Sequence, residues 1–304
     1  MPFSGVLAKR HFDKVTISMR NTGKNLKLVV NNLTVSYHDE GPIDAPTIIF
    51  IHGFPFNKSM WEPQMEALKQ NYRVIAYDIR GHGDSDAGNE NYSIDLFSND
   101  LLFFMDALDI EKPILCGLSM GGYIALNAIG KFPEHFAGLV LSDTQCLSDT
   151  PDTREKRMKA IEIINTNGVE KYAEESLKNL FAPQSFTTKK KEISDIRNMI
   201  LQTSKQSLSY TLFALSERKG TCSKLQDIEV PVLILVGKED KITPPIAAKM
   251  MQEKIQGSLL KIIEDAGHVA NLENPSEFND QVNRFMGQFV KKTSPERHLK
   301  ALVM

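Results

Sequence analysis

Residues 113–130, PILCGLSMGGYIALNAIG, place a serine between a strand and a helix. The run 114–116 has the length and β-branched character of a buried strand, and apolar residues recur at helical spacing from Tyr123 to Ile129. Between them GLSMG forms a G-x-S-x-G pattern around Ser119. A sharp turn of this kind holds the serine in strained backbone geometry, with its hydroxyl clear of the sheet, as a nucleophile requires. The alternative is a turn serine that caps the helix.

Apolar runs of strand length alternate with stretches of helical length, which favours an open, mostly parallel sheet flanked by helices. Ser93 is the expected cap of one helix and Ser59 that of another. The expected strands are two runs from residue 26 joined at Asn31-Asn32, followed by 47–51, 73–77, 114–116, 136–141, 230–236 and 259–263. Outside residues 146–221, the expected helices are 58–69, 93–109, the helix that follows Ser119 (called the elbow helix), 245–256 and 276–290.

The alternation stops between residues 146 and 221, where only helical stretches are expected, near 153–166, 169–180, 188–202 and 205–217. This segment is predicted to be a helical insertion placed over the sheet. The predicted organisation is an N-terminal extension (1–25), a core (26–145 and 222–290), a helical cap (146–221) and a C-terminal tail (291–304).

Composition excludes several classes of protein. The 304 residues are 41% apolar and 24% charged, with a formal net charge of −2, so neither nucleic acid nor a membrane is an expected partner. No apolar run is long enough to span a bilayer, and the N-terminus lacks the apolar core of a signal peptide. Three scattered cysteines predict neither a disulfide framework nor a zinc site. We expect each to be a small buried residue in a reducing, cytoplasmic compartment.

A serine needs an adjacent base to take its proton. His268 follows an expected strand, lies in a Gly-His turn and comes after Ser119 in the chain. Catalytic groups of open parallel sheets gather at the carboxyl ends of the strands, so His268 is the predicted base. His82, in a glycine-rich loop after another strand, is the alternative.

The base needs an acid to orient its ring and stabilise the imidazolium. Asp240 and Asp143 both follow expected strands and both lie between Ser119 and His268 in the chain. Asp240 is preferred because its strand is next to the histidine's, and the choice between the two aspartates stays open.

Backbone N–H groups are the best donors to a developing oxyanion. One is expected from Met120, at the start of the elbow helix, where the helix dipole adds positive potential. The other is expected from Phe54, in the His52-Gly53-Phe54 turn, with Gly53 allowing the tight bend. The alternative is an ordinary turn that ends a strand.

Together these segments resemble the α/β-hydrolase fold family over residues 26–290, and especially its carboxylesterases, enol-lactone hydrolases and cofactor-free haloperoxidase-type esterases. The resemblance implies a catalytic triad of Ser119, Asp240 and His268 and an oxyanion role for His52-Gly53-Phe54. It also implies a cap that sets substrate preference. The matching segments are HGFP (52–55), DIRGHGDS (78–85), GLSMGG (117–122), GKEDKITP (237–244) and AGH (266–268).

The predicted activity is hydrolysis of a small to medium, moderately hydrophobic ester or lactone through an acyl-enzyme, with no metal and no cofactor. The alternatives are a carbon–carbon bond hydrolase and a ligand-binding or signalling protein that keeps the triad. The predicted substrate-binding residues are His52 and Gly53, together with Phe181, Phe186, Leu212 and Phe213 of the cap. The sequence does not indicate the oligomeric state.

Overall fold

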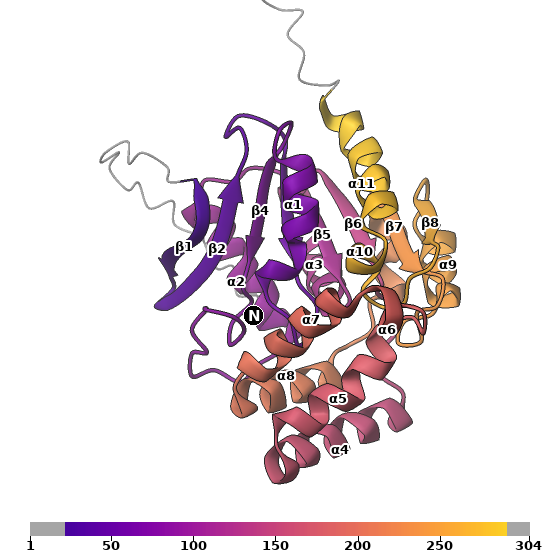
Figure 1. The fold of residues 1–304 in the computed structure, drawn as a ribbon. Coiled ribbons are helices and arrows are strands. Elements are labelled where there is room, and N and C mark those ends of the chain that lie inside the picture. Colours follow the sequence, from indigo (N-terminus) through magenta and orange to yellow (C-terminus); the bar gives the residue numbers. More distant parts are fainter. Residues whose placement is uncertain (1–21, 291–304) are drawn as a thin grey trace, which may run out of the picture.

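The computed structural model describes residues 22–290, which form an eight-stranded sheet covered by helices on both faces (Figure 1). The strand order is β1-β2-β4-β3-β5-β6-β7-β8. Strand β2 is antiparallel to both of its neighbours, whereas the six strands β3 to β8 run parallel to one another. The strands are β1 (Gly23–Val30), β2 (Leu33–Glu40), β3 (Thr47–Ile51), β4 (Arg73–Tyr77), β5 (Ile114–Leu118), β6 (Gly138–Ser142), β7 (Val232–Gly237) and β8 (Leu259–Ile263).

Most of the helices predicted outside the segment between β6 and β7 are present in the structure. Ser93 caps α2 by accepting the N–H of Leu96, as expected, whereas Asn57 rather than Ser59 caps the first helical turn after β3. Asn57 is the N-cap because its side-chain amide oxygen accepts the N–H of Ser59. These helices are η1 (Lys58–Trp61), α1 (Glu62–Leu68), α2 (Ile94–Ala107), α3 (Met120–Lys131), η2 (Pro133–His135), α9 (Pro245–Lys254), α10 (Ala270–Glu273) and α11 (Pro275–Val290).

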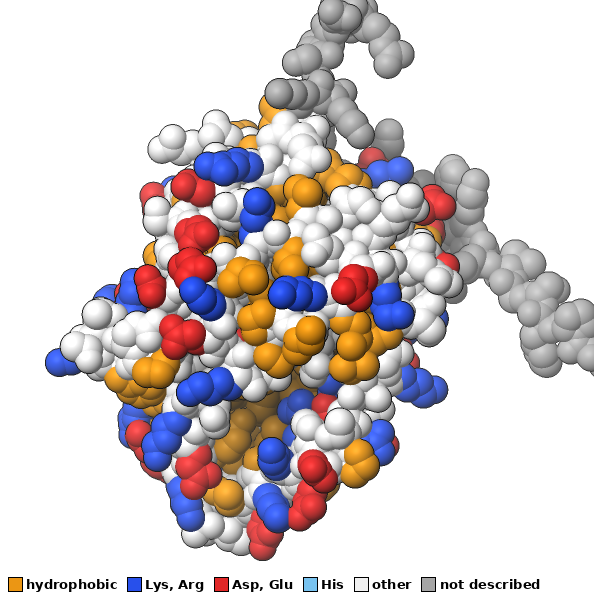
Figure 2. Space-filling view, turned by 90° about the vertical axis from the view of Figure 1, so that its right-hand side faces the viewer, with side chains coloured by type: hydrophobic (Ala, Val, Ile, Leu, Met, Phe, Trp, Pro, Cys, Tyr) orange, Lys and Arg blue, Asp and Glu red, His pale blue; other side chains and the backbone are white. Residues whose placement is uncertain are grey.

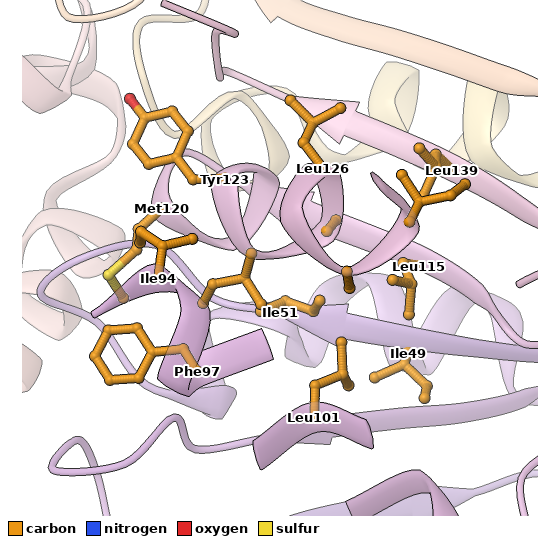
Figure 3. Packing of buried hydrophobic residues seen from close by; sticks show 14 of the residues in the cluster. Ile49, Ile51, Ile94, Phe97, Leu101, Leu115, Met120, Tyr123, Leu126 and Leu139 are labelled. Carbon is orange, nitrogen blue, oxygen red and sulfur yellow. The ribbon is translucent and has the colours of Figure 1, made fainter. Parts of the chain in front are cut away.

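The central strands are mostly apolar because their two faces are buried. Ile49 and Ile51 of β3 belong to one hydrophobic cluster with α2 and α3, whereas Ile48 and Phe50 belong to a second cluster with α1 and α11. Figure 3 shows the first cluster, in which α2 and α3 pack their apolar side chains over the sheet. These two layers hold the carboxyl ends of the parallel strands in place.

Five helices between β6 and β7 form what we call the helical block, which lies across one end of the sheet (Figure 1). Among the described residues 146–221 the structure has no strand, as predicted, but it adds a short helix, α6, that the sequence pattern did not indicate. The block consists of α4 (Pro151–Asn167), α5 (Val169–Leu180), α6 (Ser185–Thr188), α7 (Lys190–Gln202) and α8 (Lys205–Glu217).

The prediction for the cysteines is wrong for two of the three. Cys146, just before α4, and Cys222, which opens η3 (Cys222–Asp227) after α8, form a disulfide bond. The sequence did not reveal this pair, because the two cysteines are 76 positions apart and only the fold brings both ends of the helical block together. Cys116 is free and buried in β5, as expected, and burial raises the pKa of its thiol.

The predicted N-terminal extension and C-terminal tail lie outside the described residues, except that β1 begins at Gly23, three residues before the expected start of the core. The division into a core and a cap stays a prediction. In the described range, no helix is long and apolar enough to cross a membrane.

Candidate active site

Ser119 lies at a sharp turn between β5 and α3. Its backbone φ is 53° and its ψ is −112°, a conformation that side-chain-bearing residues rarely adopt. A Cβ on Gly117 would lie 2.3 Å from the carbonyl oxygen of Gly121, and one on Gly121 would lie 2.1 Å from that of Ile51. The two glycines of the G-x-S-x-G pattern are therefore required by close backbone approaches. The turn leaves Ser119 9% exposed at the end of the sheet.

The hydroxyl of Ser119 meets the ring of His268. Ser119 Oγ lies 2.9 Å from His268 Nε2. His268 follows β8 in the loop that leads into α10, and it is 2% exposed. Its backbone N–H donates to the carbonyl of Leu180 in the helical block, at 2.8 Å. The geometry lets Nε2 accept the serine proton.

Asp240 lies on the other side of the same ring. Its Oδ2 is 2.8 Å from His268 Nδ1 and accepts the Thr243 hydroxyl at 2.7 Å, while its Oδ1 accepts the N–H groups of Ile242 and Thr243. Burial alone would lower the pKa of His268, but the charge and the hydrogen bond of Asp240, together with the charges of Asp143 and Glu273, raise that pKa overall. Burial likewise opposes ionisation of Asp240, yet His268 and the Thr243 donors hold the pKa of Asp240 below its usual value. The pair therefore favours a charged acid beside a basic imidazole.

Asp143, the other candidate acid, is engaged elsewhere. Its Oδ1 accepts the N–H of Gly237 at 2.8 Å and its Oδ2 lies 2.7 Å from the Ser142 hydroxyl. Burial and the nearby charge of Asp240 raise the pKa of Asp143 well above its usual value. No hydrogen bond within residues 22–290 joins it to His268. Of the two aspartates that the sequence left as alternatives, only Asp240 therefore hydrogen-bonds His268.

The His52-Gly53-Phe54 turn follows β3 beside Ser119. His52 Nε2 accepts the N–H of Ile79 at 3.0 Å, so its Nδ1 carries the proton and donates to Gly53 O at 2.8 Å. His52 is fully buried, which lowers its pKa well below the usual value. With both nitrogens engaged and no surface exposed, the ring braces the turn, and a role of His52 in substrate binding stays a prediction.

The predicted oxyanion donors are free for a ligand. Within the described chain, neither the N–H of Phe54 nor that of Met120 makes a hydrogen bond. Met120 is the first residue of α3, where the helix dipole is positive. Gly53 fits closely against Leu118, since a Cβ there would lie 2.8 Å from a Leu118 methyl carbon.

His82 does not reach Ser119, and its loop is a structural element. Its Nδ1 hydrogen-bonds Arg80 O at 3.0 Å, and burial lowers its pKa to about 4. Asp78 organises the loop by pairing with the buried Lys58 ammonium at 2.7 Å and accepting the N–H of Asp84. These contacts agree with the implied structural role of the RGHGDS segment.

The four predicted cap residues separate into two kinds. Phe181 and Leu212 are buried in the second hydrophobic cluster, whereas Phe186 and Phe213 are 42% and 54% exposed. The aromatic residue of the block that faces the Phe54 ring is instead Tyr172 of α5, with ring centroids 6.5 Å apart. Its place in an amphipathic helix was the only sequence signal, and that pattern cannot tell which neighbour the helix meets.

A cavity of about 350 Å³ lies away from this site, between α2, α3 and the two chain segments that lead into and out of the helical block. Neither Ser119 nor Asp240 nor His268 lines it.

Figure 2 shows mixed Lys, Arg, Asp and Glu side chains over one face of the molecule, with a hollow lined by hydrophobic side chains at the level of the helical block. The described residues contain no group of three or more His, Cys, Asp or Glu side chains that could hold a metal ion.

Comparisons with known proteins identify the family of the chain. Residues 46–275 match the family model described as the alpha/beta hydrolase fold. A 3-oxoadipate enol-lactonase from Acinetobacter baylyi is 32% identical over 246 residues, which is 81% of this chain and 90% of that protein.

Two solved structures are similar over nearly their whole length. An esterase from Thermogutta terrifontis superposes with a TM-score of 0.82 at 29% identity, covering 88% of this chain and 99% of the other. An enol-lactonase from Burkholderia xenovorans superposes with a TM-score of 0.81 at 26% identity, covering 86% of this chain and all of the other.

Proposed function

Because the chain belongs to the alpha/beta hydrolase fold family, we propose that it is a serine hydrolase that cleaves a carboxylic ester or lactone. The observation that carries the proposal is the chain of hydrogen-bonding distances from Ser119 Oγ to His268 Nε2 (2.9 Å) and from His268 Nδ1 to Asp240 Oδ2 (2.8 Å). Nucleophile, base and acid in this order are what acyl transfer requires.

In the proposed mechanism Ser119 Oγ attacks the carbonyl carbon while His268 Nε2 takes the serine proton. The N–H groups of Phe54 and Met120 stabilise the oxyanion, and Asp240 stabilises the imidazolium. The carbon–oxygen bond of the ester then breaks, and the alcohol leaves with the proton from His268. A water molecule attacks the acyl-enzyme, its proton passes to His268, and the acid is released as Ser119 regains its hydrogen.

The substrate class rests on the relatives. One group is named for enol-lactone hydrolysis and another for ester hydrolysis. A lactone is a cyclic ester, so the same attack serves both, and the alcohol stays attached to the acyl group when the ring opens. We propose that the helical block acts as the cap, with Tyr172 facing the acyl or alcohol group near Phe54.

The test of the proposed function is covalent labelling combined with turnover. A fluorophosphonate should label the wild-type protein at Ser119 and leave Ser119→Ala unlabelled. Sustained turnover of p-nitrophenyl acetate, p-nitrophenyl butyrate or an aliphatic δ-lactone is expected. A stoichiometric burst without turnover would favour the ligand-binding alternative, and equal labelling of the alanine variant would refute the nucleophile.

A cytoplasmic location stays a prediction, and the disulfide bond counts against it. Structural disulfides are rare in reducing compartments, so the Cys146–Cys222 bond removes the argument that rested on the cysteines.

A further inference from the structure

Glu273, at the end of α10, is a buried carboxylate that the proposed mechanism does not use. It is 3% exposed and lies five residues after His268 in the chain. Its Oε1 accepts the N–H of Ala182 at 2.7 Å and the hydroxyl of Ser185 at 2.6 Å, and its Oε2 accepts the N–H of Gly267 at 2.7 Å. Three donors from two separate parts of the chain thus converge on one carboxylate.

These donors come from the places where the helical block touches the histidine loop. Ala182 lies between α5 and α6, Ser185 is the first residue of α6, and Gly267 precedes His268 directly. The approach is close, since a Cβ on Gly267 would lie 2.8 Å from the backbone nitrogen of Ala182. The His268 N–H completes the junction by donating to the carbonyl of Leu180 at 2.8 Å. The block and the loop are therefore joined at the residue that contacts Ser119.

The chemistry of the junction demands a carboxylate. All three partners of Glu273 donate hydrogen bonds, and a carboxylate is the only side chain of this size that offers acceptors at both oxygens. A glutamine would turn an N–H₂ group toward one of the donors. Burial raises the pKa of Glu273, and the hydrogen bonds from the three donors oppose that effect. Leaving a buried donor without a partner is costly, so the carboxylate holds both segments in register.

We propose that Glu273 is a positioning residue, which ties the helical block to the Gly267–His268 backbone and so fixes the His268 ring against Ser119 in a closed site. The proposal rests on the proposed function of Ser119 and His268. It assigns the block a second role besides substrate selection, because the seating of the segment between α5 and α6 becomes part of the geometry of the base. Glu273 itself touches neither the substrate nor the reacting atoms.

The charge of Glu273 provides a readout that a merely structural residue would not move. The charged groups that act on His268 are Asp240, Asp143 and Glu273, and each raises the pKa of the imidazole. Replacing Glu273 with a neutral residue removes one of these contributions. The acid limb of kcat/KM, which reports the histidine of the free enzyme, should then move to lower pH.

The experiment compares Glu273→Gln with two matched variants, using p-nitrophenyl acetate across pH. Glu273→Gln should lower kcat by on the order of 10- to 100-fold, the scale of a small misplacement of a catalytic group, and shift the acid limb downward. Ser185→Ala removes one donor but keeps the charge, so it should lower kcat less and leave the limb in place. Glu239→Gln removes a carboxylate that bonds Gln184 of the same segment, and both quantities should stay at wild-type values.

A cooperatively folded Glu273→Gln with wild-type kcat and an unmoved acid limb would overturn the proposal. If that variant does not fold, Ser185→Ala decides: a reduced kcat with an unmoved limb supports the proposal, and a wild-type kcat overturns it. Failure of the proposed function is recognised separately, since the wild-type protein would then show no fluorophosphonate labelling at Ser119, whatever the state of Glu273.

Discussion

Asp143 and Asp240 follow the neighbouring parallel strands β6 and β7, yet only Asp240 hydrogen-bonds the ring of His268. Asp143 points instead to the N–H of Gly237, the last residue of β7. Each aspartate is buried, and the charge of Asp240 raises the pKa of Asp143. Two carboxyl groups at one edge of the sheet are thereby pushed toward different protonation states.

This difference predicts unequal effects of removing each charge. Asp240→Asn should lower kcat by on the order of 10⁴-fold, because the amide favours the wrong tautomer of His268 and cannot stabilise the imidazolium. Asp143→Asn should stay within about tenfold of wild type, since Asp143 makes no hydrogen bond to His268 and the asparagine oxygen can still accept the N–H of Gly237. The measurement is kcat on one ester, after confirming cooperative unfolding of both variants. The reverse order of losses would make Asp143 the acid.

The pH dependence of kcat/KM should identify the base. His268 must be unprotonated to accept the serine proton, and Asp240 raises its pKa above the usual value of about 6.5. Activity should therefore fall as the pH drops, with the midpoint above about 6.5. His82→Gln should leave this limb unmoved. A limb near the pKa of about 4 that burial gives His82 would instead point to that residue.

Substrate preference should depend on Tyr172 more than on the exposed aromatic residues of the helical block. Tyr172→Ala opens space beside Phe54, so the ratio of kcat/KM for p-nitrophenyl butyrate to that for the acetate should change by on the order of tenfold. Phe213→Ala is the matched control, because its ring is 54% exposed and its loss should leave the ratio unchanged. An unaltered ratio in Tyr172→Ala, or a change only in Phe213→Ala, would place the substrate elsewhere.

Reduction of the Cys146–Cys222 bond should destabilise the protein. The bond links cysteines 76 positions apart, and the chain entropy that it removes from the unfolded state corresponds to about 4.5 kcal/mol. Dithiothreitol should therefore lower the urea midpoint of the wild-type protein but not that of Cys146→Ala/Cys222→Ala, which should already unfold at the lower midpoint. Equal midpoints for oxidised and reduced wild-type protein would contradict this expectation.

The local sequence determined the strands, the elbow and the order of the chemical groups. A largely apolar run such as residues 47–51 predicts a strand whose two faces are both buried, as in a parallel sheet. The glycines around Ser119 are required because a Cβ at either position would collide with nearby backbone atoms. The consistency of these short-range signals is why the sequence could predict the fold, the strand-end positions of Ser119 and His268, and two alternative acids, Asp240 and Asp143.

Only the tertiary structure decided which groups meet over long distances. The bonds of His268 to Asp240 rather than Asp143, the disulfide that joins the ends of the helical block, and the contact between Tyr172 and Phe54 all depend on how separate elements pack. Glu273 belongs to the same class, because its partners in the block lie about 90 residues away and no local pattern marks a carboxylate that they will surround. Hydrophobic periodicity specifies which face of an element is buried, whereas the identity of its neighbour is settled only when the whole chain has packed.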